Sequence, residues 1–304
     1  MDIAALNTRF GAPGEITFAA GQGGLPVVRI RNRSAEALVS LYGGQVLAFR
    51  SAEAQADLLF LSERAHYQAG KAIKGGIPIC WPWFGDDPEG RGRGAHGFAR
   101  NRLWSVVDVR QLESGETRLD LRLTGDADSR PLWSHDFELE LRITVGPSLA
   151  LLLVTRNTGA QPFIVTQALH TYFAVGDIDQ VSVHGLDGQH FLDKVRGFAR
   201  AQQSGPVRFD REVDRIYLQT AGPLQIDDAS LQRRILIEAL GSQTAVVWNP
   251  WQAVARASAD LADDAYRHFV CVETANAADD AIEVTAGGEH QIGARYAIAP
   301  IAYG

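Results

Sequence analysis

The chain is poor in cysteine, methionine and positive charge, and it has no long apolar run. Its 304 residues include 2 cysteines and 1 methionine, and the formal net charge is −7. Cys80 and Cys271 cannot cross-link a chain of this length, which favours reduced thiols and a cytoplasmic location. The acidic balance argues against general binding to nucleic acid or to an anionic membrane, because both attract basic surfaces.

Signals for membrane insertion or export are also missing. No stretch approaches the roughly 18 consecutive apolar residues that a membrane helix needs. Residues 1–15 lack the basic segment and apolar segment of a secretory signal. No repeat, low-complexity tract or linker interrupts the chain, so we expect one domain over residues 1–304, acting as a monomer.

The dominant hydrophobic period is two. From Phe137 to Val145, apolar and polar side chains alternate, as in a strand with one face buried and one in water. Similar or continuous apolar runs occupy residues 119–123, 149–155, 163–169, 234–239, 244–248, 268–273 and 291–298. Helical patterns are short, at 62–68 and 259–267. These patterns predict an all-β fold, a large antiparallel β-sandwich with a few short helices.

Residues 71–85 break the strand pattern. Gly75 and Gly76 permit close backbone approach, and two prolines exclude a regular central strand. Trp81, Trp83 and Phe84 then form an aromatic cluster. The cluster is either a flat apolar surface for a sugar ring beside a lysine or a buried plug under a loop.

A glycine-rich loop at residues 90–104 carries arginines in an otherwise acidic chain. They are Arg91, Arg93, Arg100 and Arg102. A guanidinium matches phosphate or carboxylate, but the loop can equally be a solvated basic segment. His96 in this loop is a proton carrier or a neutral hydrogen-bond donor. The acidic run at 86–89 is expected to be a solvated loop, and the aspartates at 260, 263 and 264 to open a helix.

His170 and Glu273 end apolar strand patterns, where strand formation does not require charge. His170 is a catalyst or a satisfied core histidine. Glu273 is a desolvated general base or a charge that emerges into solvent. With His96 they are metal-ligand types, but no ligand spacing such as HxH or HExxH occurs. We therefore expect neither a metal nor a cofactor.

An ordered set of motifs carries a resemblance. It comprises Lys74 to Gly85, His96 to Asn101, Leu169 to Phe173, Glu212 to Tyr217, Val247 to Trp251 and Val270 to Glu273. Together they resemble the hexose-6-phosphate mutarotase (glucose-6-phosphate 1-epimerase) branch of the aldose 1-epimerase, or galactose mutarotase, superfamily.

The resemblance implies a galactose mutarotase-like β-sandwich that binds a small phosphorylated hexose. It implies His170 as general acid, Glu273 as general base and Asp214 as a holder of sugar hydroxyls. Lys74 and Arg100 correspond to substrate-binding positions, and we expect His96 to position a hydroxyl. Two positions depart from the family, which usually has arginine at Lys74 and often glutamine at Ala95. These departures bear on the identity of the sugar.

The function implied is interconversion of the α and β anomers of a hexose 6-phosphate, with glucose 6-phosphate as the first candidate. Three other functions stay open. They are a non-catalytic carbohydrate-binding or sugar-sensing protein, a mutarotase of unphosphorylated aldoses, and a sugar lyase or hydrolase. A hydrolase normally needs two carboxylates flanking the scissile bond, and here only Glu273 and Asp214 are candidates.

Overall fold

Three antiparallel sheets form the framework of the chain. The computed structural model describes residues 1–220 and 222–301. The N-terminal sheet has the order β1 (Ile16–Ala20), β2 (Pro26–Arg31), β3 (Ala35–Ser40) and β4 (Gln45–Ser51). The β10 (Phe163–Val165) and β21 (Ile282–Val284) strands form a separate two-stranded ribbon.

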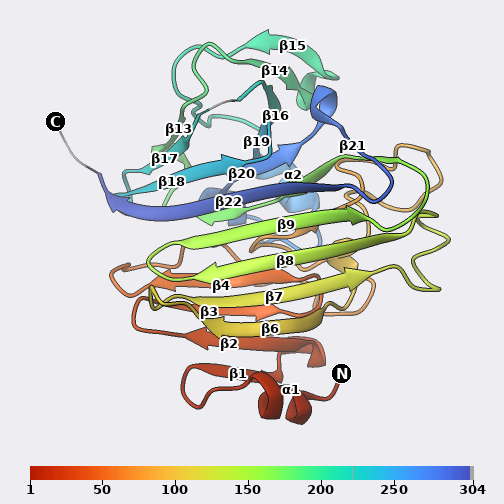
Figure 1. Cartoon of the computed structure of the whole chain (residues 1–304). Helices are drawn as coiled ribbons and strands as arrows, with labels where there is room; N and C mark the ends of the chain where they lie inside the picture. Colours follow the sequence, from red (N-terminus) through yellow and green to blue (C-terminus); the bar gives the residue numbers. More distant parts are fainter. Residues whose placement is uncertain (221, 302–304) are drawn as a thin grey trace.

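Two eight-stranded sheets complete the framework. The β9 sheet has the order β13 (Val181–His184), β17 (Leu224–Asp228), β18 (Arg233–Leu240), β22 (Glu289–Pro300), β9 (Leu149–Asn157), β8 (Phe137–Val145), β7 (Thr117–Thr124) and β6 (Ser105–Gln111). The β20 sheet has the order β15 (Ala199–Gln202), β14 (His190–Asp193), β16 (Val213–Leu218), β19 (Thr244–Asn249), β20 (Phe269–Asn276), β11 (Gln167–Leu169) and β5 (Ile79–Cys80), and β12 (Tyr172–Ala174) also pairs with β20. Figure 1 shows the β9 sheet in front, with the N-terminal sheet and the β20 sheet behind it.

The core lies between these sheets. One hydrophobic cluster joins Val28 and Phe49 of the N-terminal sheet, Leu141 and Leu153 of the β9 sheet, and Val247 and Val272 of the β20 sheet. Along β8, buried and partly exposed residues alternate without interruption. Burial of each large aliphatic side chain contributes roughly 1.5–3 kcal/mol. The antiparallel β-sandwich predicted from the alternation is confirmed, as is a strand in each expected segment.

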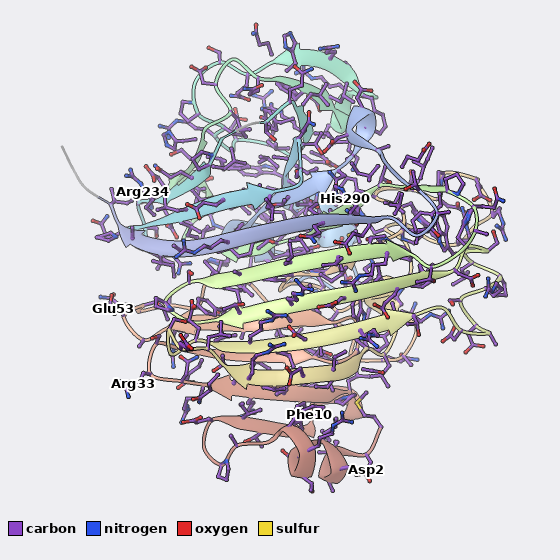
Figure 2. All side chains as sticks on the ribbon, in the orientation of Figure 1. Asp2, Phe10, Arg33, Glu53, Arg234 and His290 are labelled. Atoms are coloured by element: carbon purple, nitrogen blue, oxygen red, sulfur yellow. The ribbon has the colours of Figure 1, made fainter. Side chains whose placement is uncertain are left out.

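Both α-helices are short and were not predicted. The α1 helix (Ile3–Phe10) begins at Asp2, whose carboxylate accepts the Ala5 N–H at 3.1 Å. Figure 2 labels Asp2 and Phe10 at this helix, and the ring of Phe10 lies 6.5 Å from that of Phe18 in β1. The α2 helix (Trp251–Ala257) follows β19. Within the described residues, neither helix is long and apolar enough to cross a membrane.

The helix predicted at 62–68 does not form, and only part of 259–267 is helical. Ala65 and Tyr67, two positions apart, both pack on the cluster around Tyr42 and Ile73, which a helix cannot arrange because such positions do not share a face. The second segment contains one 3₁₀ turn, η5 (Ala265–His268). The other 3₁₀ turns are η1 (Gln22–Gly24), η2 (Ala99–Asn101), η3 (Ile178–Gln180), η4 (Lys194–Arg196) and η6 (Ala278–Asp280).

The β20 strand supplies two different environments. All its residues are buried. Val270 and Val272 belong to the core between the sheets, whereas Phe269 and Cys271 pack with Tyr172 and Leu261 in a second cluster. Because side chains alternate along a strand, Glu273 shares its face with Phe269 and Cys271, away from the main core.

Candidate active site

The structure brings His170 and Glu273 together. Glu273 lies within β20, and His170 immediately follows β11, which pairs with β20 through Leu169 and Thr274. The His170 Nδ1 atom is 3.4 Å from Glu273 Oε1. The backbone N–H of His170 donates to the Pro78 carbonyl at 3.0 Å, which fixes the end of β11 on the loop that follows Gly76.

Both side chains of this pair are withdrawn from water. His170 is 7% exposed and Glu273 is 2% exposed. Within the described residues, neither His170 Nδ1 nor Glu273 Oε2 has a hydrogen-bond partner. Burial, then the charge of Asp214, raises the pKa of Glu273 well above its usual value. Burial, then the neighbouring His96, lowers the pKa of His170 well below its own. Such an unsatisfied, desolvated pair is typical of a catalytic site.

The His96 ring lies beside the His170 ring on this face. Its ring centroid lies 5.5 Å from that of His170 and 5.0 Å from that of Phe84. Its Nδ1 accepts the Gly85 N–H at 3.3 Å, which places the ring hydrogen on Nε2. Burial lowers the pKa of His96 to about 3. A neutral ring with a donor at Nε2 supports the interpretation as a hydrogen-bond donor and argues against the proton carrier.

Asp214 borders the pair from β16. It is held by Lys194, whose Nζ is 2.7 Å from Asp214 Oδ2. The charges of both residues influence the pKa of Glu273, so all three belong to one electrostatic cluster. Lys194 was not predicted from the sequence. Its place is set by the pairing of β14 with β16, which the sequence alone does not reveal.

Lys74 approaches from the loop before β5. Its Nζ is 3.5 Å from Asp260 Oδ2 and 5.8 Å from the centre of the Trp248 ring. The loop fits only because of its glycines: a Cβ on Gly76, where φ is +62°, would meet the Val46 carbonyl oxygen at 2.2 Å. The close approach predicted for this segment is confirmed.

Arg100 has unmet hydrogen-bonding capacity, as does Arg233 in β18 among the described residues. One Nη of Arg100 donates to the Ala95 carbonyl at 2.9 Å, and the buried Nε has no partner in the described residues. Its charge lowers the pKa of both His170 and Glu273. A guanidinium that keeps an unsatisfied N–H and acts electrostatically on two buried acid–base groups can bind an anion.

Comparison with known proteins identifies the family of the chain. Residues 26–297 match the aldose 1-epimerase family. The chain belongs to the aldose 1-epimerase family. It is therefore an isomerase, as the sequence resemblance predicted. A relative from Cenchrus ciliaris, named as a candidate glucose-6-phosphate 1-epimerase, is 39% identical over 262 residues, covering 83% of this chain and 78% of that protein.

Two bacterial proteins of the family extend the similarity. A protein of Escherichia coli (strain K12) that bears the same candidate name is 36% identical over 256 residues and covers 84% of each chain. The crystal structure of a candidate mutarotase from Salmonella typhimurium superposes with a TM-score of 0.88 at 31% identity, covering 94% of each chain. The predicted galactose mutarotase-like fold is confirmed.

The aromatic cluster of this aldose 1-epimerase family member is mainly structural. Trp81 and Trp83 are buried, and the Trp81 ring packs 4.4 Å from that of Phe137 in β8. The buried plug is the correct reading for both tryptophans. The aromatic side chains near His170 are others: the Tyr172 ring stacks on it at 4.8 Å, and the Trp248 ring meets it edge-on at 5.9 Å.

Two expectations about charged segments are met only in part. The run at 86–89 is a loop with Asp86 and Glu89 exposed, as expected, but the Asp87 carboxylate pairs with the buried Arg93 guanidinium, which also lies over the Trp83 ring. Arg93 therefore stabilises the loop and is not free for substrate. Of the three aspartates expected to open a helix, only Asp264 does so, as the residue that caps the short η5 turn, whereas Asp260 pairs with Lys74 and Asp263 with Arg64. The interpretation of Glu273 as a solvated strand end is wrong.

Metal-ligating side chains do not gather into a group of three within residues 1–220 and 222–301. Cys80 and Cys271 are both unpaired and buried on the face that carries Glu273. Burial raises the pKa of Cys80 to about 12, so this thiol stays protonated.

Proposed function

We propose that the protein interconverts the α and β anomers of a hexose 6-phosphate, with glucose 6-phosphate as the first substrate to test. The observation that carries this proposal is the buried His170–Glu273 contact of 3.4 Å beside cationic groups. The names of the relatives from Cenchrus ciliaris and Escherichia coli support the choice of sugar.

The reaction needs one proton to leave and one to arrive. Glu273 takes the proton of the anomeric hydroxyl while His170 protonates the ring oxygen. The bond between C1 and the ring oxygen breaks, C1 becomes an aldehyde, and the C1–C2 bond rotates. Closure on the other face returns both protons, so no net proton or electron is consumed.

In its active state the pair shares a single proton. A raised pKa at Glu273 and a lowered pKa at His170 both favour the state with one proton in total. The pKa directions favour the neutral acid beside a neutral imidazole, whereas the proposed step uses a carboxylate beside an imidazolium, which forms when that one proton moves from Glu273 to His170 within the pair. Substrate therefore meets one group able to donate and one able to accept, and each such contribution adds on the order of 10²–10⁴ in rate.

Arg100 and Lys74 are the proposed phosphate ligands. Arg100 offers an unpaired Nε, and Lys74 is half-buried beside the Trp248 ring. A phosphate fixed at one end of the sugar also orients C1 toward the pair, which converts binding into rate.

Anomer exchange of glucose 6-phosphate, followed by NMR saturation transfer, tests the proposal. The wild-type protein should accelerate exchange, and Glu273→Gln and His170→Asn should each abolish the acceleration while the melting temperature is kept. Binding of the sugar phosphate without exchange would favour the carbohydrate-binding alternative.

A mutarotase of unphosphorylated aldoses is the second candidate. It is favoured by the contact of Lys74 with Asp260, which engages one of the proposed phosphate ligands, and by Ala95, which offers no side-chain hydrogen bond. Equal exchange efficiencies for glucose and glucose 6-phosphate would support this second function.

A further inference from the structure

Lys194 has a defined place next to the acid–base pair. It opens η4 directly after β14, and β14 pairs with β16 through Asp193 and Arg215, one residue from Asp214. The Lys194 ammonium therefore reaches the Asp214 carboxylate across neighbouring strands at 2.7 Å. The side chains are 27% and 18% exposed, so the contact is partly shielded from water.

Two residues in the left-handed backbone conformation close the turn that begins at Lys194. Gly197 has a φ of +61° and Phe198 a φ of +64°. Their backbone N–H groups donate back to Lys194 at 3.2 Å and to Asp193 at 2.8 Å. Phe198 is 55% exposed, so its side chain does not explain this unfavourable conformation for a non-glycine residue. This backbone conformation instead allows the hydrogen bonds that hold Asp193 and Lys194 in the turn.

Asp214 needs a cation to stay an acceptor. Burial raises its pKa, the charge of Lys194 opposes that rise, and Asp193 adds to it. Glu212 and Glu273 also face this position, and the charge of Asp214 raises the pKa of each. Without Lys194 the carboxyl group would bind a proton more readily and would then offer a donor where a sugar hydroxyl needs an acceptor.

We propose that Lys194 is a positioning residue, which fixes the Asp214 carboxylate beside the His170–Glu273 pair so that it accepts hydrogen bonds from the sugar hydroxyls. The proposal rests on the proposed function. Lys194 acts through Asp214 and not as a phosphate ligand, because its ammonium is already engaged at 2.7 Å.

A double-mutant cycle on glucose 6-phosphate exchange tests this role. The variants are Lys194→Met, Asp214→Asn and their combination, with Lys194→Arg as the conservative variant. Arg196→Met is the matched control, because Arg196 lies on the same 3₁₀ turn, loses the same charge and is 72% exposed. Should Lys194→Met not fold, Lys194→Gln takes its place.

We expect Lys194→Met to raise KM by about tenfold to a hundredfold, because Asp214 loses a charged hydrogen-bond partner. Lys194→Arg should recover most of this loss. The combined variant should be no weaker than Asp214→Asn alone, because the two residues act as a unit. The Arg196→Met variant should match the wild-type protein.

Two results would overturn the role of Lys194. Losses that multiply in the combined variant would make Lys194 an independent ligand, and a Lys194→Met protein equal to Arg196→Met would remove it from the site. Neither result affects the proposed function, which fails only if the wild-type protein does not exchange anomers.

Discussion

Two glutamates on two sheets show opposite uses of charge. Glu140 lies on the outward face of the β9 sheet, where its carboxylate pairs with Arg142 at 2.5 Å and with Arg156 at 2.8 Å. Partial burial raises its pKa, but these ion pairs outweigh burial and lower the pKa overall. Glu273 in the β20 sheet is buried with an unpaired oxygen, and its pKa is raised.

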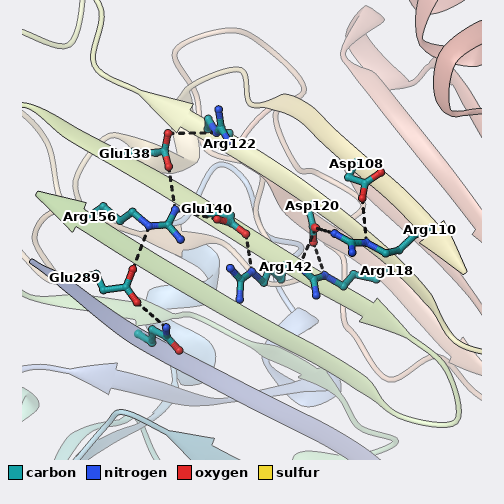
Figure 3. Close-up of polar contacts among 11 residues, drawn as sticks. Asp108, Arg110, Arg118, Asp120, Arg122, Glu138, Glu140, Arg142, Arg156 and Glu289 are labelled. Carbon is teal, nitrogen blue, oxygen red and sulfur yellow. Dashed lines mark hydrogen bonds and ion pairs between the residues drawn. The ribbon is translucent and has the colours of Figure 1, made fainter. Parts of the chain in front are cut away.

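The outward face of the β9 sheet is a network of paired charges. Figure 3 shows Arg156 bridging Glu138, Glu140 and Glu289, and a second group around Asp120. Each labelled charge there has a partner within the protein, and the parts of these side chains that make no contact face water. Such networks stabilise modestly and leave nothing for a ligand to satisfy.

The face of the β20 sheet differs because its charges are incomplete. His170, Glu273 and Arg100 each keep a buried polar atom without a partner in the described part of the chain. A buried donor or acceptor without a hydrogen bond lowers the free energy of unfolding by about 1–3 kcal/mol. Stability therefore does not explain why such groups are present. The difference between the outward face of the β9 sheet and the Glu273 face of the β20 sheet therefore separates charge used for stability from charge proposed to serve the substrate.

The same substitution on each sheet should give opposite results. Glu273→Gln should reduce the exchange rate on the order of 10²–10⁴-fold, since it removes the proposed base, with no loss of stability. Glu140→Gln should leave exchange unchanged and reduce the free energy of unfolding by about 1 kcal/mol. Saturation transfer and urea denaturation measure the two effects. Unaltered exchange in Glu273→Gln would end the assignment of the base.

The arginines extend this test to substrate binding. Arg100→Met should raise KM for glucose 6-phosphate by about 10–100-fold, because a charge-assisted contact to phosphate is lost, and should affect glucose little. Arg156→Met on the β9 sheet is the matched control. It should lower stability by about 1 kcal/mol and leave KM unchanged. Equal losses for the two sugars in Arg100→Met would place the phosphate elsewhere.

The pH profile of kcat/KM should show a plateau between an acid limb set by His170 and a basic limb set by Glu273. Activity falls at low pH when the pair takes a second proton, and the lowered pKa of His170 puts that limb below 6.5. Activity falls at high pH when the pair loses its last proton, and the raised pKa of Glu273 puts that limb above 4.5. Each limb should change the rate about tenfold per pH unit.

The substrate must be treated separately in this experiment. A phosphate ester titrates near a pKa of about 6, so its ionisation is included when the profile is fitted. An acid limb at or above pH 6.5 would mean that the free protein carries a charged His170.

The strands were predictable because their signal is local. The alternation from Phe137 to Val145 requires one buried face, and β8 shows it residue by residue. The segment 62–68 failed for the opposite reason. Its structure depends on distant partners: the Ser62 hydroxyl donates to the Asp260 carbonyl at 2.6 Å, and Ala65 packs on Tyr42 and Ile73. No pattern within seven residues contains that information.

The site was predictable only as far as its motifs. His170 and Glu273 end apolar strand patterns, whereas Asp214 was indicated only by a motif that resembles the family. Lys194 lies in a short polar turn between strands, where a lysine is ordinary. Its role depends on the pairing of β14 with β16, which a single sequence does not reveal. The contact of Lys74 with Asp260 was missed for the same reason, because it joins segments that are far apart in the sequence.

Asp260 offers the smallest expected effect and the finest comparison. It lies 3.5 Å from Lys74, so it offsets the positive charge at a proposed phosphate site much as Glu140 offsets Arg156 on the β9 sheet. Asp260→Asn should lower KM for glucose 6-phosphate by about two- to fivefold, because a half-exposed ion pair contributes up to about 1 kcal/mol. Asp263→Asn, which breaks the exposed pair with Arg64, is the matched control and should change nothing. A higher KM in Asp260→Asn would instead show that this carboxylate holds Lys74 in place for the phosphate.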